Sequence, residues 1–355
     1  MSNTPQTTDR LWEPGAACPY DEVIDVRSPG EFADDHAPGA VNLPVLSDAE
    51  RAEVGTVYRD NPFAARKVGA ALVSANVGRH LRAHFADKGK GYRPLVYCWR
   101  GGQRSASLAT VLAAVGWRVT VLAGGYVTYR DHVRQKLDEL PPRLAFRVVA
   151  GATGSGKTRL LHHLAARGGQ VLDLEGLAGH RGSILGAVGP QPPQKLFESR
   201  LLDALGRLDP ARPVWVEAES RRIGDRFVPP AVWAGMTAAE GVEVRVPTAG
   251  RVRHLLAEYP HLVADPARLK GLLRGLAGRR GPRQVAAWEE LIDAGRWDEL
   301  VASLLETHYD PGYTASTREN FPNVTGVVEL ADPTPAGFDR LADELLAAER
   351  VVGAA

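Results

Sequence analysis

Cys98 is the residue whose surroundings in the sequence best suit a chemical reaction. It follows three β-prone residues, 95–97, that predict a short buried strand, and it precedes a glycine-bearing turn and a helix-forming run that starts at Ser105. The backbone N–H groups of such a loop converge on one point, where they bind anions and favour a thiolate. Arg104 adds a planar cation that suits phosphate-like groups. A thiolate in this cradle would be a nucleophile that faces a tetrahedral anion.

We therefore expect Cys98 and Arg104 to be catalytic, on a loop that binds an anion through Trp99, Arg100, Gly101, Gly102, Gln103 and Ser105. The alternative is a structural cysteine, since free cysteines are often buried and inert. The glycine pair, the arginine at its fixed offset and the helix start favour the reactive interpretation.

A second stretch has the pattern G-x-x-x-x-G-K-[ST], between a predicted strand and a predicted helix, which is the context that this phosphate-binding motif requires. Backbone N–H groups of such a loop wrap a di- or triphosphate, and its lysine neutralises the terminal phosphate oxygens. The threonine hydroxyl would hold Mg²⁺ if a metal is present, and no other metal site is indicated. The predicted phosphate-binding residues are Gly151, Thr153, Gly154, Ser155, Gly156, Lys157 and Thr158.

Acidic residues follow two further predicted strands, where P-loop proteins place a carboxylate for Mg²⁺ or a water. The candidates are Asp173, Glu217 and Glu219. Alternation along a strand puts Glu217 and Glu219 on one face, so spacing alone does not choose between them. A solvated strand end is the alternative interpretation.

Two short segments could contact a substrate. One is a glycine-rich loop with His180, Arg181 and Ser183, and the other is a turn that combines stackable rings with polar groups, His308, Tyr309 and Asp310. Packing in the core or in a turn is the alternative for the second segment.

Residues 251–283 are predicted to be helical and are rich in arginine. A run of charge is usually a solvated helix face. This run is long and has one sign near its end, so contact with a nucleic acid backbone is the functional hypothesis. The candidate contacts are Arg251, Arg253, Arg274, Arg279, Arg280 and Arg283.

The chain of 355 residues is long for one hydrophobic core, so two domains are expected. Strands that alternate with helices predict an α/β fold, and the proline pair at 141–142 marks a boundary. We expect a lead-in over 1–20, a small parallel-sheet domain over 21–140, a P-loop NTPase-like core over 141–250, a helical basic region over 251–310, and the C-terminal part of the P-loop domain over 311–355.

The composition excludes several classes of protein. A net charge of +1 makes no global case for nucleic acid binding, so such a site must be local. Two cysteines give neither a disulfide framework nor a zinc-finger spacing, and a reactive thiol fits the reducing cytoplasm. No apolar run has the length of a signal peptide or a membrane span, so a cytoplasmic protein is expected.

The first domain resembles the rhodanese family. The matching motifs are DVRSPGEF at 25–32, PGAVNLP at 38–44 and the Cys98 loop, in that order. The loop departs from common sulfurtransferases because it reads C-x5-R-S, one residue longer, as in the dual-specificity phosphatases that share the fold. A wider loop would admit an anion of phosphate size.

Nearly the whole chain resembles the tRNA 2-selenouridine synthase family. Beyond the P-loop, the resemblance rests on YCWRGGQRS at 97–105, NPFAARK at 61–67, HRGS at 180–183, PPQKLFE at 192–198, EAESRRIG at 217–224 and HYDP at 308–311. The resemblance implies replacement of sulfur by selenium in the wobble 2-thiouridine of tRNA. Selenium comes from selenophosphate, and the intermediate is S-geranyl-2-thiouridine, which is made from geranyl diphosphate.

On this resemblance, Cys98 carries selenium as an S-selanylcysteine and the basic region contacts tRNA. The implied partners are tRNA, selenophosphate and geranyl diphosphate, with no covalently bound cofactor, Mg²⁺ as an option, no membrane and a monomeric state. Since this chemistry needs no ATP, the hypothesis is that the P-loop holds the diphosphate of geranyl diphosphate. The alternatives are a C-x5-R phosphatase, a thiosulfate sulfurtransferase with a nucleotide-binding domain, and a non-catalytic RNA-binding module.

Overall fold

The chain forms two compact units in the computed structural model, which describes residues 4–182, 185–186, 189–331 and 333–352. Unit 1 comprises residues 1–139 and 192–207, and unit 2 comprises residues 140–191 and 208–355. The predicted α/β class with parallel sheets is confirmed in both units. Among the described residues, no helix combines the length and the apolar character that crossing a membrane requires.

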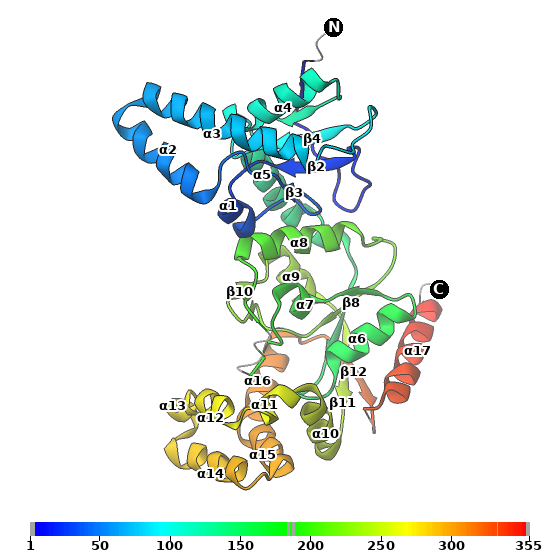
Figure 1. The fold of residues 1–355 in the computed structure, drawn as a ribbon. Helices are drawn as coiled ribbons and strands as arrows, with labels where there is room; N and C mark the ends of the chain where they lie inside the picture. Colours follow the sequence, from blue (N-terminus) through cyan, green and yellow to red (C-terminus); the bar gives the residue numbers. More distant parts are fainter. Residues whose placement is uncertain (1–3, 183–184, 187–188, 332, 353–355) are drawn as a thin grey trace. The chain divides into compact units, whose positions relative to one another are not determined.

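Unit 1 is built on a five-stranded parallel sheet with the order β1-β5-β4-β2-β3 (Figure 1). Its strands are β1 (Gln6–Thr8), β2 (Glu22–Asp25), β3 (Val41–Asn42), β4 (Pro94–Tyr97) and β5 (Thr120–Leu122). Its helices are α1 (Pro29–Asp34), α2 (Asp48–Asp60), α3 (Pro62–Arg82), α4 (Gln103–Val115), α5 (Gly125–Glu139) and α8 (Gln194–Gly206). Strand β4, which precedes Cys98, is buried throughout and lies at the centre of the sheet.

Two expectations about the limits of this unit need correction. The residues expected as a loose lead-in contain β1, which pairs in parallel with β5 from Gln6 to Thr8. Residues 192–207, expected within the P-loop core, belong to unit 1, where α8 packs against α5 and α1. An ion pair between the nearly buried Arg130 and Glu198 of α8 holds this helix in place. Sequence periodicity carries no signal for such long-range pairing.

Unit 2 has its own five-stranded parallel sheet with the order β12-β11-β6-β8-β7. The strands are β6 (Phe146–Ala150), β7 (Gln170–Leu172), β8 (Val214–Glu217), β11 (Gly241–Arg245) and β12 (Val324–Glu329), and a separate hairpin is formed by β9 (Arg222–Ile223) and β10 (Arg226–Phe227). Helix α6 (Lys157–Ala166) and the C-terminal helix α17 (Pro335–Val352) pack together, and their leucines share one core with the sheet.

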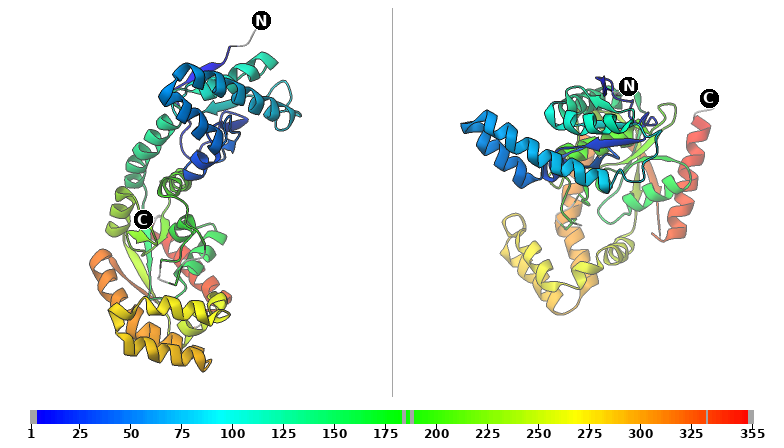
Figure 2. Two further views of the ribbon diagram at one scale, coloured as in Figure 1. Left: turned by 60° about the vertical axis from the view of Figure 1, so that its left-hand side comes forward. Right: turned by 45° about the horizontal axis from the view of Figure 1, so that its top comes forward.

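The remaining helices of unit 2 include a separate helical cluster, yellow to orange in Figure 2. Its apolar core is centred on the fully buried Trp288. Three of the remaining helices lie outside this cluster and precede it in the chain. They are η1 (Pro141–Arg143), α7 (Leu174–Ala178) and α9 (Pro230–Ala238). The cluster and the segment after it comprise α10 (Thr248–Glu258), α11 (Pro260–Val263), α12 (Pro266–Arg274), α13 (Ala277–Arg280), α14 (Pro282–Asp293), α15 (Trp297–Leu304), the π-helix η2 (Leu305–Tyr309) and α16 (Asp310–Asn320).

Candidate functional site

The predicted reactive cysteine lies at the carboxyl end of β4, at the base of the loop that leads into α4. Its side chain is 3 % exposed, and its Sγ atom is 3.3 Å from the Ser105 hydroxyl. That hydroxyl donates to the carbonyl of Gly102, the residue at the N-cap of α4. The loop thus brings Cys98, Gly102 and Ser105 together, as the sequence predicted. The thiol is buried at the base of the loop.

The start of α5 fixes the shape of this loop. Tyr126 N–H donates to the Cys98 carbonyl over 2.7 Å, and Val127 N–H donates to the Trp99 carbonyl over 3.2 Å. Gly125 is required at the contact, because a Cβ atom there would come within 2.2 Å of the Cys98 carbonyl oxygen. The backbone of the loop is therefore held by an element that follows it by more than twenty residues.

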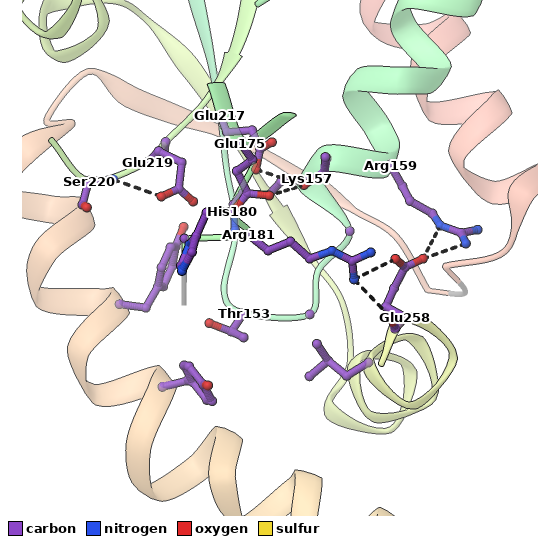
Figure 3. Close-up of a pocket in the computed structure, with 18 of the residues that line it drawn as sticks. Thr153, Lys157, Arg159, Glu175, His180, Arg181, Glu217, Glu219, Ser220 and Glu258 are labelled. Atoms are coloured by element: carbon purple, nitrogen blue, oxygen red, sulfur yellow. Dashed lines mark hydrogen bonds and ion pairs between the residues drawn. The ribbon is translucent and has the colours of Figure 1, made fainter. Parts of the chain in front are cut away.

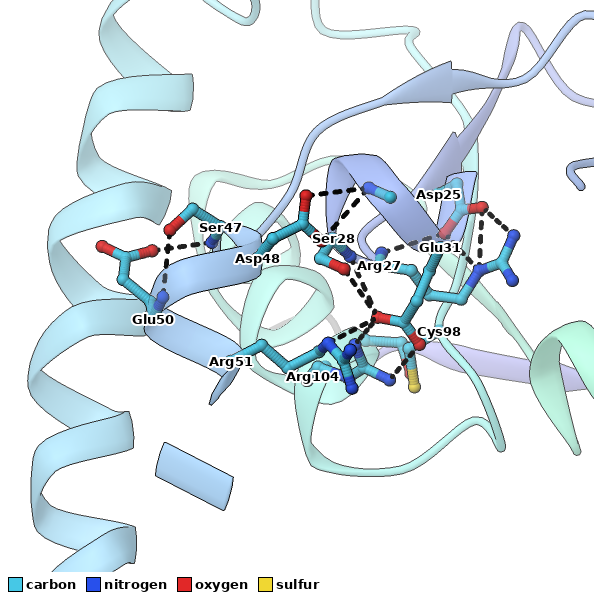
Figure 4. A network of polar contacts seen from close by, with 12 residues as sticks. Asp25, Arg27, Ser28, Glu31, Ser47, Asp48, Glu50, Arg51, Cys98 and Arg104 are labelled. Atoms are coloured by element: carbon cyan, nitrogen blue, oxygen red, sulfur yellow. Dashed lines mark hydrogen bonds and ion pairs between the residues drawn. The ribbon is translucent and has the colours of Figure 1, made fainter. Parts of the chain in front are cut away.

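Arg104 has a partner that the sequence did not predict. Its Nη1 atom is 2.6 Å from Glu31 Oε2 and its Nη2 atom is 3.3 Å from Glu31 Oε1 (Figure 4). Glu31 also accepts from the backbone N–H and the hydroxyl of Ser28 at the start of α1. Burial opposes ionisation of Glu31, but its contacts with Arg104 and Ser28 together hold its pKa below the usual range.

The phosphate-binding motif forms the expected loop between β6 and α6. Gly154 and Gly156 have φ angles of 81° and 78°, in the left-handed region that favours glycine. A Cβ atom on Gly156 would also come within 2.4 Å of the Phe338 ring. The Lys157 ammonium donates to the Gly151 carbonyl over 2.9 Å, so it lies across the mouth of the loop.

Three glutamates meet beside this loop, from the ends of β8 and from α7. Carboxylate oxygens of Glu175, Glu217 and Glu219 lie within 4.8 Å of one another. The Thr158 hydroxyl is 3.1 Å from Glu175 Oε2 and 3.2 Å from Glu217 Oε2. Both acidic candidates at the end of β8 belong to this group, and Glu175, which is two positions after Asp173 in the sequence, joins them from α7.

The third acidic candidate has a structural role. Asp173 caps α7 by accepting from the Gly176 N–H over 2.8 Å, and it also lies 3.3 Å from the His162 ring. It borders the same cavity but stands outside the group of three glutamates. Of the three predicted acidic residues, Glu217 and Glu219 therefore belong to the group that the structure brings together, and Asp173 does not.

The environment of Glu175 and Glu217 opposes their ionisation. Burial, helped by the charge of Glu219, raises the pKa of Glu175 to about 8. Burial and then the charges of Glu175 and Glu219 raise the pKa of Glu217 well above its usual value. Among the described residues, Glu217 Oε1 has no hydrogen-bond partner although it is buried. The three carboxyl groups, which include the unpartnered Glu217 Oε1, and the Thr158 hydroxyl form a set of hard oxygen ligands that fits Mg²⁺.

A cavity of about 1220 Å³ in unit 2 joins the P-loop, the glutamates and most predicted substrate residues (Figure 3). His180, Arg181, His308 and Tyr309 line it, although the two segments that carry them are far apart in the sequence. Burial lowers the pKa of His180, which favours its neutral form at pH 7. Arg181 pairs with Glu258 over 3.3 Å. Ser183 lies outside the described residues.

Asp310 differs from its neighbours His308 and Tyr309, because it pairs with Arg251 instead of lining the cavity. The shortest distance between the two side chains is 2.8 Å, and Arg251 is 6 % exposed. Arg251 is therefore unsuited to the expected contact with tRNA, since its guanidinium is buried and paired with a carboxylate. This pair instead ties α10 to the start of α16.

The other basic candidates fall into two groups. Arg279 and Arg280 line the cavity, where Arg280 also donates to the carbonyl of His308 over 3.0 Å. Arg253, Arg274 and Arg283 are exposed, and Arg274 is paired with Glu289 over 2.6 Å. The arginines of the predicted basic region are thus divided among a buried ion pair, a cavity wall and the outside of the helices.

Comparisons with known proteins agree with this architecture. The fold and the sites define a parallel α/β unit with a cysteine at a strand end, joined to a P-loop unit with a cluster of three glutamates. Residues 7–132 match the rhodanese-like domain, and residues 144–275 match the tRNA 2-selenouridine synthase AAA domain.

Curated relatives extend the match across both units. A tRNA 2-selenouridine synthase of Psychromonas ingrahamii is 32% identical over 82% of this chain and 86% of its own length, and one of Shewanella loihica is 33% identical over the same shares. A third relative, from Nitrosomonas europaea, is 38% identical over a match that covers 67% of this chain and 63% of that relative. The chain belongs to the tRNA 2-selenouridine synthase family.

The pairing of Glu31 with Arg104 predicts a pH-dependent stability. Glu31→Gln should lower the free energy of unfolding at pH 7 by about 1–3 kcal/mol, because a charge-assisted pair is lost. A lowered carboxyl pKa contributes stability above the unfolded pKa, and this contribution is lost as the pH falls through the folded pKa. The difference between variant and parent should therefore shrink below about pH 4.

Thermal unfolding of both proteins between pH 3 and pH 8 measures this difference. The matched control is Asp21→Asn, which removes the exposed pair of Asp21 with Arg93 and should change the melting temperature little. A difference that stays constant down to pH 3 would contradict the assigned role of Glu31.

Proposed function

We propose that this chain is a tRNA 2-selenouridine synthase, which replaces the sulfur of wobble 2-thiouridine in tRNA by selenium taken from selenophosphate. The observation that carries the proposal is the extended match to relatives of that name, which includes both the Cys98 loop and the P-loop. The two sites provide the two kinds of chemistry that such a conversion needs, a carrier for selenium and a cradle for a diphosphate.

The first step would take place in the P-loop cavity. The sulfur of 2-thiouridine attacks C1 of geranyl diphosphate, the C1–O bond breaks, and the diphosphate leaves with the electron pair. The base loses its N3 proton to solvent, which leaves neutral S-geranyl-2-thiouridine. Backbone N–H groups of residues 151–158 and the Lys157 ammonium would stabilise the charge that develops on this leaving group. Mg²⁺, if bound by Thr158, Glu175, Glu217 and Glu219, would supply further positive charge there.

The second step would use the selenium that Cys98 carries as an S-selanyl group. Selenium adds to C2 of the geranylated base, the C2–S bond breaks, and geranylthiol leaves after taking up a proton. A small-molecule thiol, the two-electron reductant that this step requires, then attacks Cys98 Sγ, so that the S–Se bond breaks, its electron pair stays on selenium, and a mixed disulfide forms on Cys98. The N–H groups at the start of α4 would hold the phosphate group of selenophosphate near Sγ. Arg104 would assist if its guanidinium bound the anion, either while it keeps its contact with Glu31 or after it releases Glu31.

Loss of the carrier thiol should separate the two steps. In reactions with tRNA, selenophosphate and geranyl diphosphate, Cys98→Ser should abolish 2-selenouridine while S-geranyl-2-thiouridine still forms, because the P-loop cavity is intact. Mass spectrometry of the nucleosides measures both products. Cys18→Ser, which changes the exposed second cysteine, is the control and should behave like the parent. Selenation by Cys98→Ser at the parental rate would refute the carrier role.

Removal of the P-loop lysine should weaken binding of the diphosphate. Lys157→Ala is expected to reduce the affinity for radiolabelled geranyl diphosphate about 10- to 100-fold, the loss of one or two charge-assisted contacts. Lys136→Ala changes a lysine of unit 1 outside the cavity and should leave the affinity unchanged. Undiminished binding by Lys157→Ala together with lost ATP binding would instead assign the loop to a nucleotide.

A divalent cation should stabilise unit 2 through the glutamates. Mg²⁺ would relieve the repulsion among three close carboxylates, so saturating Mg²⁺ should raise the melting temperature. At a Mg²⁺ concentration of 100 times its Kd, the free energy of unfolding should increase by about 2.7 kcal/mol. Glu217→Gln should be more stable than the parent without Mg²⁺ and should lose most of the gain with Mg²⁺. Asp173→Asn, at the cap of α7, should keep the gain. An equal Mg²⁺ effect in Glu217→Gln would contradict the proposed metal site.

A further inference from the structure

A second, smaller cavity of about 70 Å³ adjoins the phosphate cavity in unit 2. Thr153, Leu255, Tyr259 and Tyr309 line both, so the two spaces lie next to each other at the P-loop. The smaller one, which we call the apolar cleft, extends among the helices of the cluster, where leucines and valines of α10, α11, α12 and α15 and the ring of Trp297 form its walls.

The linings of the two cavities differ sharply in chemistry. The large cavity is lined mainly by charged and polar side chains. Its cations Lys157, Arg181, Arg279 and Arg280 suit an anion of high charge, and its glutamates suit a cation bound with that anion. No charged side chain lines the apolar cleft among the described residues, and its polar side chains are Thr153 and the two tyrosines at the shared edge, together with the indole of Trp297. A ribose or a base placed there would leave most of its polar groups without partners, which is costly in a buried site.

A single ligand that occupies both spaces must therefore combine an anionic head with a hydrocarbon tail. We propose that the apolar cleft holds the hydrocarbon chain of a prenyl diphosphate whose diphosphate lies on the P-loop. This inference rests on the proposed function, since it specifies the substrate at the same site. It also assigns a role to the helical cluster, whose residues select the ligand through the length and shape of its chain.

The cleft is suited to this role because its walls belong to a packed core. Leu300 and Leu304 are 1 % and 5 % exposed, and both belong to the cluster around Trp288. Val301, from the same helix α15, lines the cleft and is only partly buried. A larger side chain at Val301 can therefore fill the cleft at a modest cost in stability, whereas removal of Leu300 would extend the cleft.

Binding measurements on the full chain test the inference with three probes, which are geranyl diphosphate, dimethylallyl diphosphate and inorganic diphosphate. In the parent, affinity should rise from inorganic to dimethylallyl to geranyl diphosphate, by roughly 10-fold or more at each step, because each step buries more apolar surface. Val301→Phe should remove this dependence on the chain and leave the affinity for inorganic diphosphate within about 2-fold.

The matched control is Leu291→Phe, which enlarges a partly buried residue of the same helical core that does not line the cleft. It should keep the order of affinities. Should Val301→Phe fail to fold, Leu300→Ala provides the second variant, because a longer cleft should shift the preference from geranyl towards the longer farnesyl diphosphate.

Two results would overturn the inference. One is geranyl diphosphate that binds the parent no more tightly than inorganic diphosphate, and the other is an unchanged chain dependence in Val301→Phe. A larger loss of ATP binding than of geranyl diphosphate binding in Val301→Phe would likewise place a nucleoside in the cleft. The proposed function is judged separately by the nucleosides of tRNA, so either proposal can fail while the other stands.

Discussion

Crowding of like charges is the constraint on which unit 2 depends. Three carboxylates share one buried corner with the Thr158 hydroxyl, and at an effective dielectric of about 20 two charges 4 Å apart repel by about 4 kcal/mol. Such a corner is tolerable only if a proton or a cation occupies it. Gly182 lies against it so closely that a Cβ atom would come within 2.7 Å of Glu219, so the loop with His180 and Arg181 is shaped by the same carboxylates. Strand ends, loop and P-loop are therefore parts of one electrostatic arrangement.

In both the P-loop and the Cys98 loop, the cation that would bind an anion already contacts an acceptor of the protein. Lys157 donates to the Gly151 carbonyl of its own loop, and Arg104 pairs with Glu31. Each cation is thus kept in position by a protein acceptor, and an incoming anion replaces or shares that acceptor instead of ordering a free side chain. Because hydrogen bonds are exchanged and not simply added, the net gain on binding is smaller than the contacts suggest, but less side-chain entropy is lost.

Sequence patterns predicted those features that local chemistry determines. The strand–loop–helix around Cys98 and the P-loop were located to within a few residues, because glycine offsets and hydrophobic runs report local conformation. Features that depend on contacts distant in sequence were not predicted. These include the pairing of Arg104 with Glu31, the burial of Arg251 against Asp310, the entry of Glu175 into the acidic group, and the apolar cleft. A run of arginines cannot by itself show which members meet a carboxylate once the helices pack.

Helix α8 has a consequence for how the chain is made. It belongs to unit 1, although the residues on both sides of it, 140–191 and 208–355, belong to unit 2. The carboxylate that pairs with Arg130 therefore leaves the ribosome long after the rest of unit 1, and after the P-loop. During translation, unit 1 cannot complete its packing until α8, which lies between two segments of unit 2 in the sequence, has been synthesised. A truncation at the proline pair at 141–142 would release a rhodanese-like fragment that exposes the surface of α5 on which α8 rests.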